Sequence, residues 1–324
     1  MDRQTRYDDG NEESVTGNLD AWQNSCLRAA VNDECFRKFR SERAFLEVVE
    51  GAPETSAIWN LKRLLKNQKF LKALPLIRQS EYIGSPRRQV LFNDPSGIEV
   101  MCSLTPTTVR YANNAANSID FFGPEILSGK YTIYEIGAGY GGECKVFNDY
   151  ARALYSRTLE KWTIFDLPTS HGVIKKFLSQ FNYSADRGSL DTFEADGPSF
   201  VMSNGALSEM RGALLESYVE KVVAPSQYGY FITNFETHSK PFGGWTTGEF
   251  LRVLRQMGKS DARELHTESY LSYFDKQARS RLIVFGTDTP TNRARRSFKD
   301  VVKILAIQMA YGVTRRLTNR MLFG

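Results

Sequence analysis

The sequence predicts a doubly wound α/β fold, in which a largely parallel sheet carries helices on both faces. Apolar strand-like runs alternate with amphipathic helical runs from residue 131 to residue 288, which is the pattern of successive strand–helix units. A cluster of glycines at 137–142 follows the first run, where the chain turns from a strand into a helix. We expect the last two of these strands to form an antiparallel edge of the sheet.

The individual elements follow from the spacing of apolar residues, which is two in a half-buried strand and about 3.6 in a helix. The predicted strands are 131–137, 161–168, 199–207, 228–236, 262–266 and 279–288. The predicted helices between them are 141–158, 169–181, 208–223 and 246–258.

One more helix is predicted directly before the sheet. Thr105 can cap its N-terminus, and Pro106 occupies the first helical position, where the missing N–H would have no partner in any case. The helix should end at Phe122, before Gly123 and Pro124.

The chain divides into four predicted regions. Residues 1–18 are polar and acidic and should be disordered, whereas residues 19–95 form a helical extension. Residues 96–290 hold the sheet, and residues 291–324 form a tail.

Helix boundaries within the extension follow from local signals. The pattern breaks at residues 51–53, Gly-Ala-Pro, and resumes with Thr55 or Ser56 as the N-cap. Pro75 is expected to end the last helix, because proline lacks the N–H that a helix interior needs.

The composition, 41% hydrophobic and 24% charged, is that of a globular protein. No apolar run reaches the ~18 residues of a membrane span, and the N-terminal segment lacks the apolar centre of a signal peptide. Cys26, Cys35, Cys102 and Cys144 form no CxxC pair, so neither a disulfide framework nor a zinc site is predicted. We therefore expect a cytoplasmic protein without a metal.

The tail is predicted to be a basic amphipathic helix. Asp300 is its single acidic residue among many lysines and arginines, and the net charge of the whole chain is +5. Such a helix can dock on its own domain or on a second copy in a homo-oligomer, or lie on the anionic inner face of a membrane. Because the basic charge is confined to the tail, no nucleic-acid partner is expected.

The glycine cluster indicates a ligand site. Gly137, Gly139 and Gly141 lie where the chain leaves the first strand, and ligands of doubly wound sheets bind beyond the carboxyl ends of the strands. Gly142 allows a second reading as GxGxxG, so the spacing alone leaves a nucleotide, a dinucleotide and a sulfonium cofactor open.

Two acidic residues narrow the choice of ligand. Glu135 lies in the strand just before the glycines, where its carboxylate can attract a cation. Asp166 ends the next strand, where an acid accepts hydrogen bonds from the hydroxyls of a ribose. The alternative for Asp166 is a helix cap.

Several motifs together resemble a known family. "EIGAGYGG" looks like the first motif of class I S-adenosylmethionine-dependent methyltransferases, and the set as a whole is similar to the bacterial sugar O-methyltransferase family. The motifs are "TPTTVRY" at 105–111, "FFG" at 121–123, "EIGAGYGG" at 135–142, "DLP" at 166–168 and "SNGALSE" at 203–209. The chain departs from the family pattern at Ala138, where glycine is usual, and at Gly205, where an aromatic residue is usual.

The resemblance implies a doubly wound, Rossmann-like methyltransferase sheet of seven strands, the last pair antiparallel. It also implies that the protein binds S-adenosyl-L-methionine and transfers a methyl group to a sugar hydroxyl. The sugar can be free, nucleotide-linked, or part of a lipid or polysaccharide. Residues expected to bind the cofactor are Arg110, Glu135, Gly137, Ala138, Gly139, Gly141, Asp166, Leu167, Ser203 and Asn204. Arg110 would hold the carboxylate of the methionine part through a charge-assisted bond.

The acceptor hydroxyl needs a base, which should lie after the fourth or fifth strand. His238 and Glu209 are the candidate catalytic residues, with a solvated loop position and a helix N-terminus as their respective structural alternatives. Residues expected to contact the acceptor are Tyr140, Asn234, Glu236 and Trp245.

Three other functions compete with this one. A methyltransferase-like scaffold without activity would use the same fold to hold a partner. A nicotinamide-dependent oxidoreductase would also fit the glycine turn, although no Tyr-x-x-x-Lys follows the fourth strand. An RNA methyltransferase is disfavoured, because no Asn/Asp-Pro-Pro-Tyr motif is present at that place.

Overall fold

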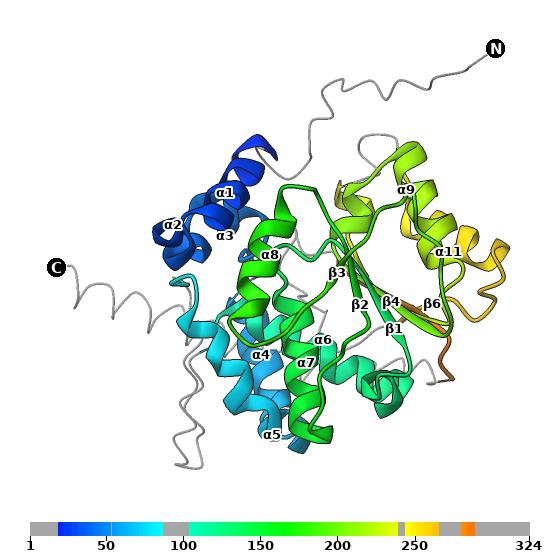
Figure 1. The fold of residues 1–324 in the computed structure, drawn as a ribbon. Helices are drawn as coiled ribbons and strands as arrows, with labels where there is room; N and C mark the ends of the chain where they lie inside the picture. The colour runs from blue at the N-terminus through cyan, green and yellow to red at the C-terminus, as the bar shows by residue number, and fades with distance from the viewer. Residues whose placement is uncertain (1–18, 53, 87–103, 239–243, 266–279, 289–324) are drawn as a thin grey trace.

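The centre of the molecule is a seven-stranded sheet with the order β3-β2-β1-β4-β5-β7-β6 (Figure 1). The computed structural model describes residues 19–52, 54–86, 104–238, 244–265 and 280–288. Its strands are β1 (Thr132–Ile136), β2 (Trp162–Phe165), β3 (Asp186–Arg187), β4 (Ser199–Asn204), β5 (Tyr228–Thr233), β6 (Arg263–Leu265) and β7 (Arg281–Phe285). Strands β1 to β5 are parallel, and β7 runs antiparallel to both β5 and β6.

This strand order confirms the predicted Rossmann-like methyltransferase fold. The chain moves outward from β1 to β3, then returns across the sheet to place β4 on the other side of β1. The order therefore reverses between β1 and β4, and the carboxyl ends of parallel strands open a crevice at such a reversal.

Helices cover both faces of the sheet, as predicted (Figure 1). Alternate residues of β1 serve the two faces: Ile133 belongs to the core beneath one helical layer, and Tyr134 and Ile136 belong to the core beneath the other. One layer holds α6 (Pro106–Phe122), α7 (Gly142–Tyr155) and α8 (Ser170–Ser179). The other holds α9 (Gly212–Tyr218), the π-helical turn η5 (Val219–Val223) and α11 (Thr247–Gln256).

The N-terminal extension packs onto the first of these layers. Its elements are α1 (Leu19–Val31), α2 (Asp33–Lys38), η1 (Phe39–Ser41), α3 (Arg43–Val48), α4 (Glu54–Leu64), α5 (Gln68–Ile77) and η2 (Arg78–Tyr82). Helix α1 contacts α8, α4 contacts α6, and α5 contacts α7. Buried residues of the extension, such as Trp22 and Phe70, belong to the same core cluster as β1 and β4. The extension and the sheet thus share one hydrophobic core.

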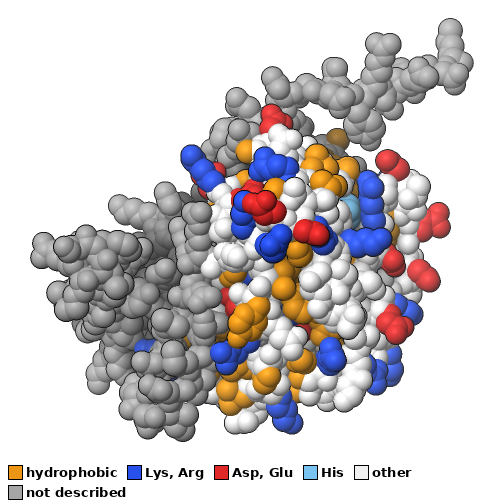
Figure 2. All heavy atoms as spheres, turned by 60° about the vertical axis from the view of Figure 1, so that its left-hand side comes forward, with side chains coloured by type: hydrophobic (Ala, Val, Ile, Leu, Met, Phe, Trp, Pro, Cys, Tyr) orange, Lys and Arg blue, Asp and Glu red, His pale blue; other side chains and the backbone are white. Residues whose placement is uncertain are grey.

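Figure 2 looks onto the side of the molecule that carries the extension. Lysines and arginines are interspersed there with acidic residues, and apolar side chains lie between them. Ion pairs such as Arg28–Glu42 and Lys176–Asp33 join neighbouring elements on this side. None of the helices within the described ranges is long and apolar enough to cross a membrane.

Two predicted helix boundaries in the extension are wrong. Helix α4 begins at Glu54, so Thr55 and Ser56 lie inside it and do not cap it. Pro75 lies inside α5, which continues to Ile77. The carbonyls of Leu76 and Ile77 at the end of this helix accept hydrogen bonds from the buried ammonium of Lys145, which adds a side-chain donor to the last turn.

Elsewhere the differences are small. Thr105, Pro106 and Gly123 define α6 as predicted, with the Thr105 hydroxyl accepting from the backbone N–H of Thr108 at 3.1 Å. Segments predicted as strand ends form two short helices, η4 (Ala206–Glu209) and α10 (Phe235–His238). The expected disorder of 1–18 and the helical tail 291–324 fall outside the described residues.

A buried cation, Arg40, joins the extension to the domain. Its guanidinium is fully buried and lies 2.5 Å from Glu50 and 3.8 Å from Glu81. It also donates to the Ser80 carbonyl and to the Thr105 hydroxyl, at 2.7 and 3.0 Å. Every one of these groups is buried, so the cluster can exist only as a complete set of charge partners.

The same cluster reaches the glycine turn and the start of α6. Glu50 accepts a hydrogen bond from the hydroxyl of Tyr140, at 3.0 Å. Glu81 accepts from the backbone N–H of Thr105 and the hydroxyl of Thr108. The extension is therefore bound to the domain by polar contacts as well as by apolar packing.

We predict that Arg40→Met lowers the free energy of unfolding by about 3–5 kcal/mol, because it leaves Glu50 and Glu81 buried without their cation. Urea denaturation would measure the loss. Arg43→Met is the control: Arg43 pairs with Glu47 on the surface of α3, and its removal should leave the denaturation midpoint unchanged. Equal midpoints for Arg40→Met and the wild type would contradict the prediction.

Candidate cofactor-binding site

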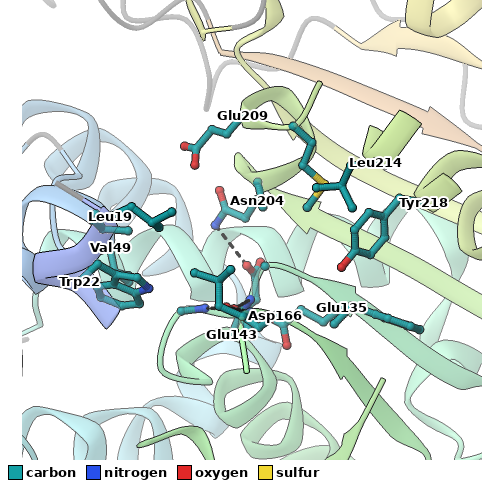
Figure 3. A pocket seen from close by; sticks show the side chains of 18 of the residues that line it. Leu19, Trp22, Val49, Glu135, Glu143, Asp166, Asn204, Glu209, Leu214 and Tyr218 are labelled. Carbon is teal, nitrogen blue, oxygen red and sulfur yellow. Dashed lines mark hydrogen bonds between the residues drawn. The ribbon is translucent and has the colours of Figure 1, made fainter. Parts of the chain in front are cut away.

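A cavity of about 1040 Å³ opens where β1, β2 and β4 end. Its floor is the turn after β1, with Glu135, Glu143 and Asp166 around it. Figure 3 shows the two walls: residues of the extension, including Trp22, on one side, and Leu214 and Tyr218 of α9 on the other. The cavity thus lies at the reversal of strand order where ligands of this fold bind.

The glycines of the turn are required by the backbone and by their protein neighbours. Gly137, Gly139 and Gly141 have φ of 78°, 62° and 87°, in the left-handed region that favours glycine. A Cβ on Gly139 would lie 2.8 Å from Cγ2 of Val49, and one on Gly137 would clash with the side chain of Ala206. The extension and η4 are therefore among the groups that approach the bare main chain.

Asp166 holds the turn in place. One of its oxygens accepts from the backbone N–H groups of Ala138 and Gly139, at 2.7 and 2.9 Å, and the other accepts from Leu167 at 2.7 Å. Burial raises the pKa of Asp166, and these hydrogen bonds oppose that rise. The predicted ribose contact stays a prediction; the structure adds the role of fixing the glycine turn.

Glu135 points from β1 into the layer beneath the cavity. It is almost fully buried, and one carboxylate oxygen accepts a hydrogen bond from the indole N–H of Trp162 at 3.0 Å. Burial raises its pKa well above the ordinary value, and the neighbouring charge of Glu143 raises it further.

Glu143, which the sequence analysis missed, is the second acid of the floor. Its two oxygens accept from the side-chain amides of Asn114 and Asn204, at 2.7 and 3.1 Å (Figure 3 shows the bond to Asn204). Burial raises the pKa of Glu143 to about 7, against the opposing effects of the two amides and of Arg110. Its place in the first turn of α7, directly after the glycines, is the sequence signal that could have identified it.

Arg110 lines the cavity from α6. One terminal nitrogen donates to the carbonyl of Val49 at 3.1 Å, and the guanidinium lies 5.6 Å from the ring centre of Tyr111. Its Nε is buried and has no hydrogen-bond partner within the described part of the chain. A buried donor left over on a cavity wall fits a ligand carboxylate, since unpaired buried polar groups are costly.

Most residues predicted to bind a cofactor come together around this cavity. Those that line it are Arg110, Glu135, Gly137, Ala138, Gly139, Asp166, Leu167 and Asn204. Gly141 instead caps α7, and the buried Ser203 donates to the carbonyl of Ile136, which ties β4 to β1 beneath the turn. These two residues support the site without forming its wall.

The structure describes the side chain of only one of the two candidate bases. Glu209 lines the cavity from η4 and is exposed at its mouth, above Asn204 in Figure 3. His238 is the last residue of α10, and its side chain lies outside the described part of the structure.

The residues predicted to contact the acceptor lie away from the cavity wall. Tyr140 is a correction: its ring is 1% exposed and packs between Phe39 and Phe177, because its hydroxyl is bonded to Glu50. Trp245 packs against Phe250 in the core on the other face of the sheet.

Asn234 and Glu236 make protein contacts, although the buried side-chain oxygen of Asn234 has no hydrogen-bond partner among the described residues. The backbone N–H of Asn234 donates to the hydroxyl of Ser208 at 2.9 Å. The carboxylate of Glu236 accepts from the backbone and the hydroxyl of Thr247 at the start of α11. Glu236 therefore serves to hold this helix.

The extension supplies a wall of the cavity that no pattern in the sequence predicts. Leu19 and Trp22 of α1 and Val48 and Val49 at the end of α3 all line the cavity (Figure 3 labels three of them). Their spacing marks them only as the apolar face of a helix, and their place at the cavity depends on how the extension docks.

Comparisons with known proteins give structural similarity only. No protein-family model and no curated protein sequence matches this chain. The CMeT domain of the citrinin polyketide synthase is similar over 70% of this chain and 68% of its own, with a TM-score of 0.39 and 14% identity. The methyltransferase domain of bacterial CtHen1 is similar over 54% of this chain and 96% of its own, with a TM-score of 0.37 and 15% identity. An O-methyltransferase family protein from Burkholderia thailandensis is similar over 56% of this chain and 61% of its own, with a TM-score of 0.33 and 14% identity. Similarity of this degree concerns the fold class alone.

We predict that Gly139→Ala destabilises the protein more than Gly129→Ala. Both glycines have positive φ, 62° and 75°, so each substitution carries a conformational cost of roughly 1–2 kcal/mol. Only at Gly139 does the new methyl group also meet a neighbour, Val49, since nothing lies within 4 Å of a Cβ at Gly129. Urea denaturation of both variants tests this prediction. Adding Val49→Ala should recover part of the lost unfolding free energy in Gly139→Ala but not in Gly129→Ala. Equal losses at the two glycines would contradict the packing against Val49.

Glu143 should make the folded state less stable as the pH rises from about 4.5 to about 7. In the unfolded chain this carboxyl ionises near its ordinary 4.5, whereas in the folded protein it keeps its proton until about 7. The folded state then binds more protons across this window, so rising pH favours unfolding. At ~1.4 kcal/mol per pH unit, the loss due to Glu143 reaches about 3 kcal/mol by pH 8.

Urea denaturation of the wild type and of Glu143→Gln at several pH values isolates this effect, because glutamine does not titrate. The free energy of unfolding of the wild type should fall relative to that of Glu143→Gln as the pH rises from 5 to 8. A difference that does not change with pH would show that Glu143 ionises normally in the folded protein.

Proposed function

We propose that this chain is an S-adenosylmethionine-dependent O-methyltransferase that methylates a sugar hydroxyl, free or carried on a nucleotide, a lipid or a polysaccharide. The observation that carries the proposal is the cavity at the reversal between β1 and β4, with a glycine turn as its floor and three acids around it. The sheet order is that of the class I methyltransferase fold.

The residues of the cavity fit the parts of this cofactor. Arg110, with its unpartnered buried Nε, would hold the methionine carboxylate. The backbone of Ala138 and Gly139 and the carboxylate of Asp166 would border the ribose, and Leu167 would pack on the adenosyl part. These acids suit a cofactor that carries positive charge, because a nearby cation favours their ionised forms.

When bound, the cofactor supplies a methyl group on a sulfonium, which is a good leaving group because it departs as a neutral thioether. The task left to the protein is to align an acceptor oxygen with that methyl group, which can contribute several kcal/mol. A general base that takes the hydroxyl proton contributes a further ~10²–10⁴-fold. Glu209, exposed at the cavity mouth, and His238 are the candidates for this base.

A sugar acceptor is supported by the motif resemblance and by the space available. The "SNGALSE" segment forms the end of β4 and η4, and brings Asn204 and Glu209 to the cavity. The volume of about 1040 Å³ lies at the upper end of the ~300–1,000 Å³ usual for one ligand. A cavity of this volume supports an acceptor bound beside the cofactor.

Calorimetric titration with S-adenosylhomocysteine tests the cofactor. We expect binding at a single site, weakened about tenfold or more by Asp166→Asn, because the weaker acceptor loosens the bonds from Ala138 and Gly139 that shape the turn. Asp186→Asn, at an exposed acid on the next strand, should leave the affinity unchanged. Folded protein that ignores this ligand but binds NAD would favour the oxidoreductase.

Transfer of a radiolabelled methyl group from S-adenosylmethionine then separates an enzyme from a scaffold. The acceptors to be compared are free monosaccharides, nucleotide sugars, glycolipids and polysaccharides. Transfer to one of these classes is the expected result. Binding of the cofactor without transfer to any of them would favour the non-catalytic scaffold.

A further inference from the structure

Glu143 is a buried acid on the cavity wall with no cation of its own. Its relative exposure is 2%, and no Lys, Arg or His of the described residues lies within 4.0 Å of its oxygens as an ion pair. Asn114 and Asn204 each give one amide hydrogen bond to a different oxygen. A carboxylate accepts up to about four hydrogen bonds, so acceptor capacity remains on both oxygens.

None of the described charged and titratable groups around Glu143 provides a close positive charge for its carboxylate. Glu135 faces it from β1 with a like charge, and Tyr111 and Arg110 face it from α6. Arg110 favours the ionised form only at long range, while its terminal nitrogen is bonded to Val49. An ionised Glu143 therefore has no close cation among the described residues, and burial makes that lack costly.

We propose that Glu143 binds the α-ammonium group of the cofactor, while Arg110 binds the carboxylate at the same amino-acid end. This inference rests on the proposed cofactor. Both side chains line the cavity beside the glycine turn, one from the start of α7 and one from α6. An ammonium brings a positive charge, which no described residue places within ion-pair distance of Glu143, and three further N–H donors for the remaining acceptor capacity.

Asn114 and Asn204 position this carboxylate. Each uses its side-chain amide as a donor to Glu143, so the carboxylate is held from α6 and from the end of β4. The ammonium then completes a site that the protein has already oriented, and little rotamer freedom is lost when the cofactor binds.

Binding should be linked to a proton. The pKa of Glu143 is raised to about 7 by burial, and a bound ammonium favours the ionised carboxylate. At pH 6 the cofactor must therefore displace a proton from Glu143, and its affinity should rise as the pH rises from 6 to 8.

Four ligands tested by calorimetry distinguish the groups that are recognised. S-Adenosylhomocysteine has both the ammonium and the carboxylate, its decarboxylated analogue keeps the ammonium, its deaminated analogue keeps the carboxylate, and 5′-methylthioadenosine has neither. Glu143→Gln should weaken the two ligands with an ammonium by about 10- to 100-fold and leave the other two unchanged. None of the four carries a sulfonium, so an effect cannot come from that charge.

Glu216→Gln is the control, because Glu216 is an exposed acid of α9 that does not line the cavity; it should leave the affinities of all four ligands unchanged. Retained binding of 5′-methylthioadenosine shows that Glu143→Gln is folded. Should that variant bind nothing, the wild type decides: titrations at pH 6 in buffers of different ionisation enthalpy should show proton release with S-adenosylhomocysteine and none with 5′-methylthioadenosine.

The outcomes separate this inference from the proposed function. If wild-type protein binds S-adenosylhomocysteine, but Glu143→Gln binds it equally well or weakens all four ligands alike, Glu143 has only a structural role and the inference is overturned. Equal proton release with both ligands at pH 6 would also overturn it. If folded wild-type protein binds none of the four ligands, the proposed function itself fails.

Discussion

The buried guanidinium of Arg40 is the contact on which the rest of the site depends. It pairs with Glu50 and Glu81 and bonds to Thr105, and Glu50 in turn accepts from Tyr140 in the glycine turn. A charge without water must have all of its partners in place at once. The extension, the start of α6 and the turn after β1 are therefore fixed relative to one another, and these are three of the segments that enclose the cavity.

Residues of the cavity likewise make more than one kind of contact. Asp166 shapes the turn by accepting from its backbone, and it stands where a ribose is expected. Val49 offers its carbonyl to Thr107 and Arg110 while its side chain lies against Gly139. Residues that build the site thus also border the space for the ligand, so binding and local rigidity are difficult to change separately.

The sequence predicted the parts of the fold that have strong local signals. Long apolar strands and the cap at Thr105 were identified, because burial and capping leave a pattern along the chain. Strand β3 consists of only two residues, both exposed, and so produces no such pattern. Pro75 led to a wrong helix boundary, because α5 accommodates the proline in its last turn and continues to Ile77.

The site was predictable to a smaller extent. The glycine turn, Asp166 and Asn204 follow from motif positions at the ends of strands, and all three line the cavity. Glu143 and the wall formed by the extension could not be found in this way, since their place depends on tertiary packing. Tyr140 was misassigned because the sequence cannot tell which side of a turn a ring faces; here it faces Phe39 and Phe177.

The contact between Val49 and Gly139 has a consequence for how such chains diverge. Two positions that lie far apart in the sequence share one small volume, so a larger residue at either would require a compensating change at the other. Exchanging the extension for that of a relative would accordingly remodel the binding pocket, and the described part of the extension is better regarded as one wall of the pocket than as an appendage to it.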